Sequence, residues 1–284
     1  MPSLRQLLAQ AAPALERAGV DAPRLTAEVL LAHSLGRERA YLYAHPEDAP
    51  EAGAQARFEH WIERRAAGVP LQYLTGEQEF YGRLFQVTPA VLIPRPETEL
   101  VVEAALEHLS LDRLPTSPPL RLADVGTGSG CLAITLALER PQAAVTATDI
   151  SAAALEIARA NAGRLGAQID FVACDLLEAV SGSAFDLIVS NPPYIAAAQW
   201  DSLQREVRDH EPRAALIAGE AGTEVYARLV AQAEARLRPG GWLVLELGYD
   251  SAGAVRSMVN ADWSAIETRR DLQGWERVLL ARRR

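Results

Sequence analysis

The sequence predicts an α/β protein with a mostly parallel sheet, helices on both faces of that sheet, and a small helical bundle in front of it. Three observations lead to this fold class. Apolar residues in the first 72 positions recur at helical spacing. From residue 120 onwards, short strand-like runs alternate with longer helical patterns, which is typical of parallel strands joined by crossover helices. Only "LQG" separates the last two strand-like runs, which is too short for a parallel crossover and predicts an antiparallel pair.

Four helices are predicted in the N-terminal part. The first has a face of leucine and alanine, an N-cap at Ser3 and a stop at Gly19. The second begins at Pro23 and ends before Gly36, where a glycine favours termination. The third covers residues 37–43 and the fourth residues 52–67. We therefore predict a first domain over residues 1–72.

A β-hairpin is predicted over residues 73–93, because this stretch is rich in strand formers and has Gly82 in its middle. Residues 94–284 form the last predicted domain. It begins with a helix whose first turn carries a proline and acidic residues. A proline-rich surface linker over residues 110–120 follows this helix.

The rest of the last domain alternates strands and helices. The predicted strands cover residues 121–126, 143–149, 168–175, 184–191, 242–248, 264–271 and 275–283. The predicted helices cover residues 129–140, 151–166, 223–241 and 251–261.

Composition and charge exclude several function classes. The net charge is −9, all 28 basic residues are arginine, and they are dispersed, which argues against a phosphate backbone as the main partner. Two cysteines, Cys131 and Cys174, are too few for a disulfide framework, and the five histidines are scattered. We expect no metal, no membrane span, no signal peptide and a cytoplasmic location.

A glycine-rich loop, "DVGTGSG", closes the first strand of the sheet and opens the next helix. Gly126, Gly128 and Gly130 permit a tight turn and the close approach of a ligand to the backbone. The next strand ends at Asp149, about twenty residues further on, where a carboxylate can accept hydrogen bonds from ribose hydroxyls. This pattern predicts a nucleotide-type ligand; the alternative is a plain strand–helix turn.

The spacing of the glycines indicates which ligand binds. The loop reads G-x-G-x-G, not the G-x-G-x-x-G of dinucleotide sites, and Asp124 precedes it. S-adenosylmethionine has no pyrophosphate but carries an ammonium, for which Asp124 and loop carbonyls are suitable acceptors. Asp175 and Leu176, after the third strand, can flank the adenine, and we interpret Cys174 as a buried small side chain.

The corner "NPPY" follows the fourth strand of the sheet, at the edge where open α/β sheets bind ligands. Its prolines fix the backbone and hold Asn191 extended. The Asn191 side-chain oxygen and the Pro192 carbonyl are two fixed acceptors, which suits a planar –NH2 group with two donors. Tyr194 can stack on the plane that carries this group. The alternative is a rigid turn that closes a strand.

Together, "NPPY" and "DVGTGSG" resemble the amino-methyltransferases, which methylate planar nitrogens with S-adenosylmethionine. Three further stretches, "PLQYLTGEQEFYGRLFQVTPAVLIPRPETE", "HEPRAALIAGEAGTEVY" and "DLQGWERV", resemble the HemK/PrmC family. That family methylates the side-chain amide nitrogen (N5) of the glutamine in the Gly-Gly-Gln motif of class I peptide-chain release factors. The resemblance runs from about residue 70 to the C-terminus, and the first 70 residues match in helical character.

The resemblance implies a class I S-adenosylmethionine-dependent methyltransferase: a Rossmann-like, seven-stranded, mostly parallel sheet with an antiparallel last strand. S-adenosylhomocysteine would be the product. The implied cofactor residues are Asp124, Gly126, Thr127, Gly128, Ser129, Gly130, Asp149, Leu176 and Asn191. The implied substrate residues are Asn191, Pro192, Pro193 and Tyr194, with catalysis assigned to Asn191, Pro192 and Tyr194.

The resemblance also implies roles for two other parts of the chain. Residues 1–72 would help to hold the release factor, the hairpin would be a linker, and residues 94–284 would be catalytic. Arg95, Glu97 and Thr98 would line the site, in roles that the resemblance does not separate; the alternative is that they only begin a helix. We expect a monomer that acts without direct contact to nucleic acid.

Three rival functions remain at this point. An amino-methyltransferase acting on adenine or guanine in nucleic acid shares the two motifs, but the charge of −9 argues against it. A nicotinamide-dependent oxidoreductase leaves "NPPY" unexplained and needs a different glycine spacing. A non-catalytic adaptor would not need both motifs intact.

Overall fold

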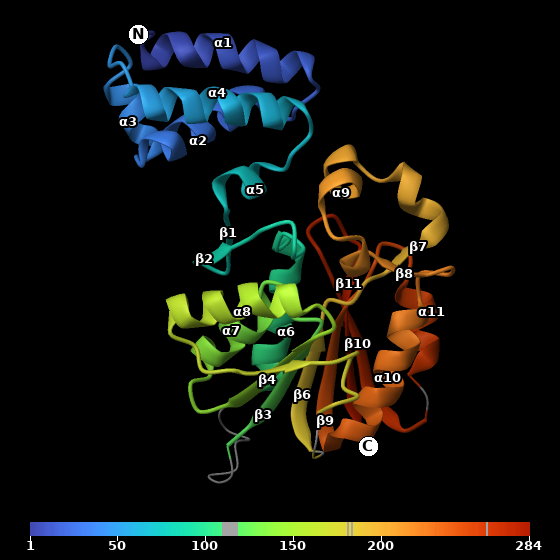
Figure 1. Ribbon diagram of the computed structural model, residues 1–284. Coiled ribbons are helices and arrows are strands. Elements are labelled where there is room, and N and C mark those ends of the chain that lie inside the picture. Colours follow the sequence, from blue (N-terminus) through green and yellow to red (C-terminus); the bar gives the residue numbers. More distant parts are fainter. Residues whose placement is uncertain (110–118, 181, 183, 260) are drawn as a thin grey trace. The chain divides into compact units, whose positions relative to one another are not determined.

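The computed structural model describes residues 1–109, 119–180, 182, 184–259 and 261–284 (Figure 1). The chain forms two compact units, Met1–Glu77 with Gln204–His210 and Gln78–Leu203 with Glu211–Arg284. The predicted proline-rich linker lies outside the described residues except for its last two positions.

The first unit is a bundle of helices around a core of leucine side chains and Phe58. Its helices are α1 (Leu4–Arg17), α2 (Pro23–Leu35), α3 (Arg39–Ala44), α4 (Ala52–Ala66), α5 (Leu71–Thr75) and α9 (Arg205–His210). Ser3 caps α1 as predicted, because its Oγ accepts from Gln6 N and its own N–H donates to the Gln6 side chain. The four predicted helices are confirmed, whereas the single turns α5 and α9 have no clear apolar period and were not predicted.

The second unit contains a seven-stranded sheet with strand order β10-β11-β9-β6-β3-β4-β5. The strands are β3 (Arg121–Val125), β4 (Ala144–Asp149), β5 (Asp170–Ala173), β6 (Phe185–Ser190), β9 (Leu237–Glu246), β10 (Trp263–Arg270) and β11 (Glu276–Arg283). β11 runs antiparallel to both of its neighbours, and the remaining pairs are parallel. The predicted sheet and its antiparallel last strand are therefore confirmed.

Helices cover both faces of this sheet, with α6, α7 and α8 on one face and α10 and α11 on the other (Figure 1). They are α6 (Glu99–His108), α7 (Cys131–Glu139), α8 (Ala152–Leu165), α10 (Glu224–Arg236) and α11 (Ala252–Met258). Along β9, Trp242 and Val244 enter one core while Leu243 and Leu245 enter the other, as the two-residue period of a strand requires. None of the helices among the described residues has the length and apolar character needed to cross a membrane.

One predicted boundary was wrong. The helix expected over residues 223–241 ends at Arg236, and β9 begins at Leu237. Pro239 lacks the N–H that a helix needs, and it holds the residue before it extended, so the chain leaves the helix early.

Several short strands and 3₁₀ turns lie outside the seven-stranded sheet. They are the predicted hairpin, β1 (Glu77–Phe80) with β2 (Arg83–Gln86), the parallel pair β7 (Ile195–Ala196) with β8 (Ile217–Gly219), and the 3₁₀ turns η1 (Pro96–Thr98), η3 (Ala197–Ser202) and η4 (Arg213–Ala215). The β7–β8 pair fixes the chain that leaves β6, because Ile195 N donates to Leu216 O at 3.0 Å.

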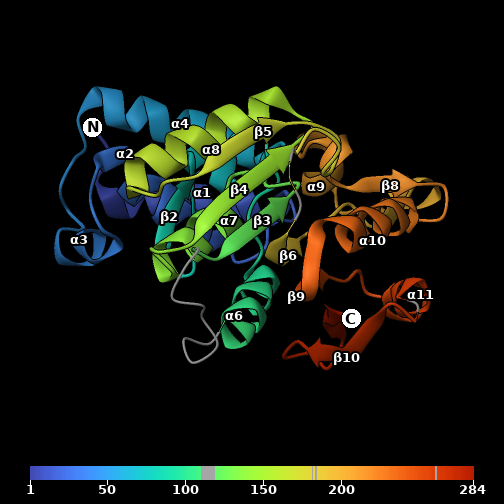
Figure 2. The ribbon, with the colours of Figure 1, turned by 90° about the horizontal axis from the view of Figure 1, so that it is seen from below.

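The strand order reverses between β3 and β6. From β3 the chain proceeds outwards to β4 and β5, which lie side by side in Figure 2, and it then returns to the other side of β3 to form β6. The two strand ends are tied together, since Ser190 Oγ donates to Val125 O at 2.6 Å. In open α/β sheets, ligands bind in the crevice at such a reversal, outside the carboxyl ends of the strands.

Gly130 lets α7 and α8 approach closely at this reversal. Its φ is +84°, and a Cβ there would lie 2.8 Å from Ile134 Cδ1 and 3.2 Å from Ala158 Cβ. Gly166 has a similar φ of +77°, but a Cβ at Gly166 would meet no heavy atom within 4 Å.

This contrast predicts unequal costs for two alanine substitutions. We expect Gly166→Ala to lower the free energy of unfolding by about 1–2 kcal/mol, the cost of a left-handed backbone for a residue with a Cβ. Gly130→Ala should cost about 1–3 kcal/mol more, because the methyl group also overpacks the α7–α8 contact. Urea unfolding of both variants measures the difference, and equal losses would contradict the packing argument.

Candidate active site

A cavity of about 390 Å³ lies at the carboxyl edge of the sheet, beside the ends of β3, β4 and β6. Eight of the predicted site residues line it: Gly126, Thr127, Gly128, Ser129, Asp149, Leu176, Asn191 and Pro193. The wall also includes Arg95 and Thr98. Four other predicted residues, Asp124, Gly130, Pro192 and Tyr194, are not part of this wall.

Asp124 lies beneath the glycine loop. Its Oδ2 accepts hydrogen bonds from Thr127 Oγ1 at 2.6 Å and Ala133 N at 3.1 Å, so the carboxylate holds the loop to the first turn of α7. Burial raises the pKa of Asp124 to about 7, although these two bonds favour the ionised form. Its Oδ1 is buried and has no hydrogen-bond partner among the residues that the structure describes. The predicted contact with the ammonium of the cofactor would use this oxygen.

Asp149 ties the loop to the end of β4 from the opposite side. Its Oδ2 accepts from Gly128 N and its Oδ1 from Ser151 N, both at 2.9 Å. Burial raises the pKa of Asp149. Because each carboxylate oxygen accepts more than one hydrogen bond, Asp149 can also accept from a pair of ligand hydroxyls.

Leu176 holds an unusual backbone conformation on the cavity wall. Its φ is +50°, which is rare for a residue with a bulky side chain. Leu177 N donates to Gln232 Oε1 at 2.8 Å, and Asp175 pairs with Arg228 at 2.5 Å, so bonds on both sides hold the turn. Leu176 is thereby presented to the cavity as an apolar surface for a flat ring.

The corner after β6 brings Asn191 and Pro193 into the cavity wall. Tyr194 packs behind them against Gly248, where a Cβ would lie only 2.8 Å from Tyr194 Cδ2. Burial raises the pKa of Tyr194 to about 12, so its hydroxyl is neutral and is not a base. The tyrosine therefore contributes through its ring and its packing.

The stretch "RPETE" both begins a helix and joins the site. It forms η1 and leads into α6, yet no side chain caps these turns. Arg95 instead pairs with the buried Glu211 at 2.5 Å. Thr98 Oγ1 accepts from Asn191 Nδ2 at 3.2 Å and donates to Glu246 Oε2 at 2.6 Å. The structure thus gives Arg95 and Thr98 distinct contacts, while Glu97 stays off the cavity wall.

Glu246 was missed by the sequence reasoning. Its side chain lies near the end of β9 and is only 1% exposed, and burial raises its pKa to about 7. The available signal was a single acid inside the apolar run "WLVLELG", because a lone charge in a buried strand needs a partner. Its partner, Thr98, lies 148 positions away in sequence, so spacing could not identify it.

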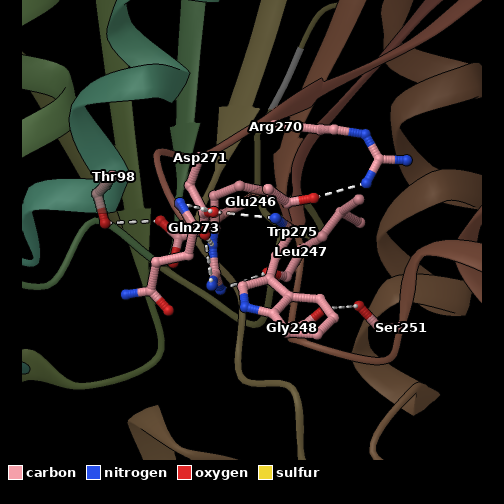
Figure 3. A network of polar contacts seen from close by, with 11 residues as sticks. Thr98, Glu246, Leu247, Gly248, Ser251, Arg270, Asp271, Gln273 and Trp275 are labelled. Carbon is pink, nitrogen blue, oxygen red and sulfur yellow. Dashed lines mark hydrogen bonds and ion pairs between the residues drawn. The ribbon is translucent and has the colours of Figure 1, made fainter.

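The C-terminal stretch "DLQGWERV" supports the backbone next to Glu246 (Figure 3). Arg277 Nη1 donates to Leu247 O at 3.0 Å, and Leu247 N donates to Arg277 O at 2.7 Å. Asp271 Oδ2 accepts from Arg277 Nε and Nη2 at 3.1 and 3.0 Å. Gln273 N and Trp275 N donate to Asp271 Oδ1, which fixes the β10–β11 turn.

The residues present fit S-adenosylmethionine. Gly126 and Gly128 line the cavity, and a Cβ at either position would meet open space, so side chains there would fill the ligand cradle. Asp149 on the cavity wall suits the ribose hydroxyls and Leu176 the adenine, while the assignment of the ammonium to the buried Asp124, which lies off the wall, stays a prediction. Across the described residues, no cluster of histidine, cysteine, aspartate or glutamate side chains is arranged to hold a metal ion.

Comparisons with known proteins agree with this geometry. Residues 6–76 match the family described as PrmC N-terminal domain, and residues 105–208 match the Methyltransferase small domain. A release factor glutamine methyltransferase of Koribacter versatilis is 48% identical over 282 residues, covering 99% of both chains. One from Deinococcus radiodurans is 48% identical over 285 residues, covering 99% of this chain and 98% of its own.

A solved structure shares the fold. The T. thermophilus 16S rRNA methyltransferase in complex with AdoMet and guanosine matches with a TM-score of 0.53 and 23% identity. The match covers 73% of this chain and 50% of that one. At this identity the likeness shows the sheet and its helices, and it does not decide the acceptor.

The partnerless oxygen of Asp124 predicts a pH-dependent affinity for the cofactor. With a pKa of about 7 in the ligand-free protein, Asp124 is mostly protonated at lower pH and cannot then accept fully from an ammonium. The affinity for S-adenosylmethionine should rise between about pH 5.5 and 7, by up to about tenfold per pH unit below the pKa. Asp124→Asn should bind more weakly, with most of this pH dependence lost.

Titration calorimetry at several pH values measures both effects. Asp175→Asn is the control, because this carboxylate also lies on the cavity wall but already pairs with Arg228. Its affinity for S-adenosylmethionine should change with pH as steeply as that of the wild type. An unchanged slope in Asp124→Asn would contradict the assignment of the ammonium to this carboxylate.

Proposed function

Because the chain belongs to the release factor glutamine methyltransferase family, we propose that it methylates the glutamine of the Gly-Gly-Gln motif in class I peptide-chain release factors. The methyl group goes from S-adenosylmethionine to the side-chain amide nitrogen, N5. The observation that carries the proposal is the position of Asn191, on the wall of the same cavity as the glycine loop and Asp149.

The acceptor nitrogen determines what the site has to do. An amide nitrogen is a weak nucleophile, because its lone pair is delocalised into the carbonyl. The Asn191 side-chain oxygen and the Pro192 carbonyl each accept one N–H of the glutamine amide, which turns the nitrogen towards the methyl group. Holding the reactants in this geometry can supply about 7–11 kcal/mol of the barrier reduction.

The bound cofactor supplies a methyl group on a sulfonium, whose C–S bond breaks as the C–N bond forms and whose electron pair stays on sulfur in S-adenosylhomocysteine. The glutamine nitrogen becomes positively charged during transfer, and two fixed acceptors beside it stabilise that charge. The nitrogen then releases one proton to water, so the site needs no strong base. The neutral Tyr194 ring packs behind the corner and limits its movement.

The charge of the protein supports a protein acceptor. The net charge of −9 opposes binding to a phosphate backbone. The match of residues 6–76 to the PrmC N-terminal domain supports a role of the helical unit in holding the release factor. We further propose that the enzyme is a monomer and acts in the cytoplasm, where translation terminates.

Mass spectrometry tests the reaction and the acceptor together. The purified protein is incubated with S-adenosylmethionine and an unmodified class I release factor, and the factor is then digested. We expect one added methyl group on the glutamine of the Gly-Gly-Gln peptide. Methyl transfer to DNA or RNA in a parallel reaction, with none to the release factor, would show that the methyl acceptor is a nucleic-acid base and not the glutamine.

The role of Asn191 predicts a selective loss of rate. Asn191→Ala removes one of the two fixed acceptors and should lower kcat by about 10²–10³-fold. The affinity for S-adenosylmethionine should stay within a few-fold, because the loop and Asp149 remain. Steady-state kinetics with calorimetry separates the two effects.

Tyr194→Phe provides the matched control for Asn191→Ala. It keeps the ring and removes a hydroxyl that is neutral throughout the physiological range, so it should retain most of the activity. Near-normal turnover of Asn191→Ala would show that the proposed role of Asn191 is wrong.

A further inference from the structure

We propose that Thr98 and Glu246 are positioning residues that fix the rotation of the Asn191 side-chain amide, so that its oxygen and not its nitrogen faces the acceptor. This inference rests on the proposed function, because it assumes that Asn191 holds a planar –NH2 group. It assigns a role to two residues that do not take part in bond making themselves.

The three residues form a continuous hydrogen-bonded chain from three separate elements. Asn191 follows β6, Thr98 ends η1, and Glu246 ends β9. Asn191 Nδ2 lies 3.2 Å from Thr98 Oγ1, which lies 2.6 Å from Glu246 Oε2 (Figure 3 shows the second contact). Thr98 is 2% exposed and Glu246 is 1% exposed, so water does not compete for the contact between them, whereas Asn191 is half-buried at the cavity wall.

The chemistry of a carboxylate gives this chain a direction. An ionised carboxylate only accepts hydrogen bonds, so the Thr98 hydroxyl must point its proton at Glu246. The remaining lone pairs of Thr98 Oγ1 then require a donor, and the amide nitrogen of Asn191 is that donor. The opposite rotation of Asn191 would place its oxygen against those lone pairs, which would leave the buried Thr98 oxygen without that donor.

The direction matters because both ends of an asparagine amide have nearly the same shape. Packing alone therefore distinguishes poorly between the two rotations, whereas hydrogen bonding distinguishes them well. In the observed rotation the Asn191 oxygen remains available to accept from an incoming –NH2. In the opposite rotation the –NH2 group of Asn191 would face the –NH2 group of the substrate glutamine. The glutamine would then lose one of its two fixed hydrogen-bond acceptors.

The backbone that follows the Glu246 side chain is held by two other residues. Tyr226 Oη donates to the Glu246 carbonyl at 2.8 Å, and the Arg277 contacts described above hold Leu247. Thr98 is the N-cap residue of α6, but its side chain makes no capping hydrogen bond that would explain its hydroxyl. These contacts fix the Glu246 carboxylate, which orients Asn191 through the hydroxyl of Thr98.

The same chain makes turnover depend on the charge of Glu246. A protonated Glu246 can donate a hydrogen bond to Thr98. The hydrogen bonds among Glu246, Thr98 and Asn191 then no longer select one rotation of the Asn191 amide. Burial raises the pKa of Glu246 to about 7, and the hydrogen bond from Thr98 and the charges of Arg277 and Arg95 partly offset that rise. The other ionisable groups with which it interacts are Glu97, Tyr194, Tyr226 and Cys131. kcat should therefore fall as the pH drops below about 7.

Three substitutions test the proposal in the full-length enzyme. Thr98→Val keeps the shape of the side chain and removes the hydroxyl, and we expect kcat to fall by about 10–100-fold. Thr98→Ser keeps the hydroxyl and should retain kcat within about threefold. Glu246→Gln cannot ionise, so it should lower kcat and abolish its decline at low pH. All rates are measured on the release factor at saturating S-adenosylmethionine, which separates them from changes in cofactor affinity.

A double-mutant cycle separates positioning from a general structural effect. Because Thr98 acts through Asn191, Thr98→Val should cost little in an Asn191→Ala background. Melting temperatures and cofactor affinities of all variants show whether each is folded. If Thr98→Val proves unstable, the comparison of the wild-type and Glu246→Gln pH profiles carries the test.

Two results would overturn the proposal. One is a Thr98→Val enzyme with kcat within about threefold of the wild type while Asn191→Ala is inactive. The other is a Glu246→Gln enzyme whose kcat declines at low pH in the same way as that of the wild type. Failure of the proposed function looks different, since the wild-type enzyme would then leave the release factor unmethylated.

Discussion

The pairing of β3 with β6 is the constraint on which the rest of the structure depends. The chain leaves these two neighbouring strands towards opposite ends of the sheet, which opens a crevice between their carboxyl ends. The bond from Ser190 Oγ to Val125 O holds the two ends together at that point. The glycine loop leaves one strand and Asn191 follows the other, so the topology brings the loop and Asn191 to one cavity.

Buried carboxylates organise this edge of the sheet. Asp124 lies under the loop and Glu246 lies behind Asn191, and burial raises the pKa of each to about 7. A buried carboxylate is costly unless it is hydrogen-bonded, so these acids persist only with their partners. Asp124 has its partners in the loop and in the first turn of α7, while Glu246 pairs with Thr98 at the start of α6. In both cases the acid fixes backbone or side-chain geometry next to the cavity, in a region where small displacements reduce rates strongly.

The strand β11 does not contribute to the cavity wall, but it supports the site through the C-terminal hairpin that it forms with β10. Arg277 on β11 bonds both to Leu247 at the end of β9 and to Asp271 in the β10–β11 turn. This bracing holds the chain at Gly248, against which Tyr194 packs at close range. The antiparallel last strand therefore secures the back of the asparagine corner, and the stretch "DLQGWERV" has a physical role there.

The sequence by itself determined the fold class, the seven strands and the residues on the cavity wall from Gly126 to Ser129, Asp149, Leu176 and Asn191, because these follow from local periodicity and from turns at strand ends. Sequence patterns did not separate the roles of Arg95 and Thr98 and did not identify Glu246. Their partners lie more than a hundred positions away, at Glu211 for Arg95 and at Glu246 for Thr98. Only the tertiary structure decides such contacts, because the register of a sheet and the packing of a helix start bring distant side chains within hydrogen-bonding distance.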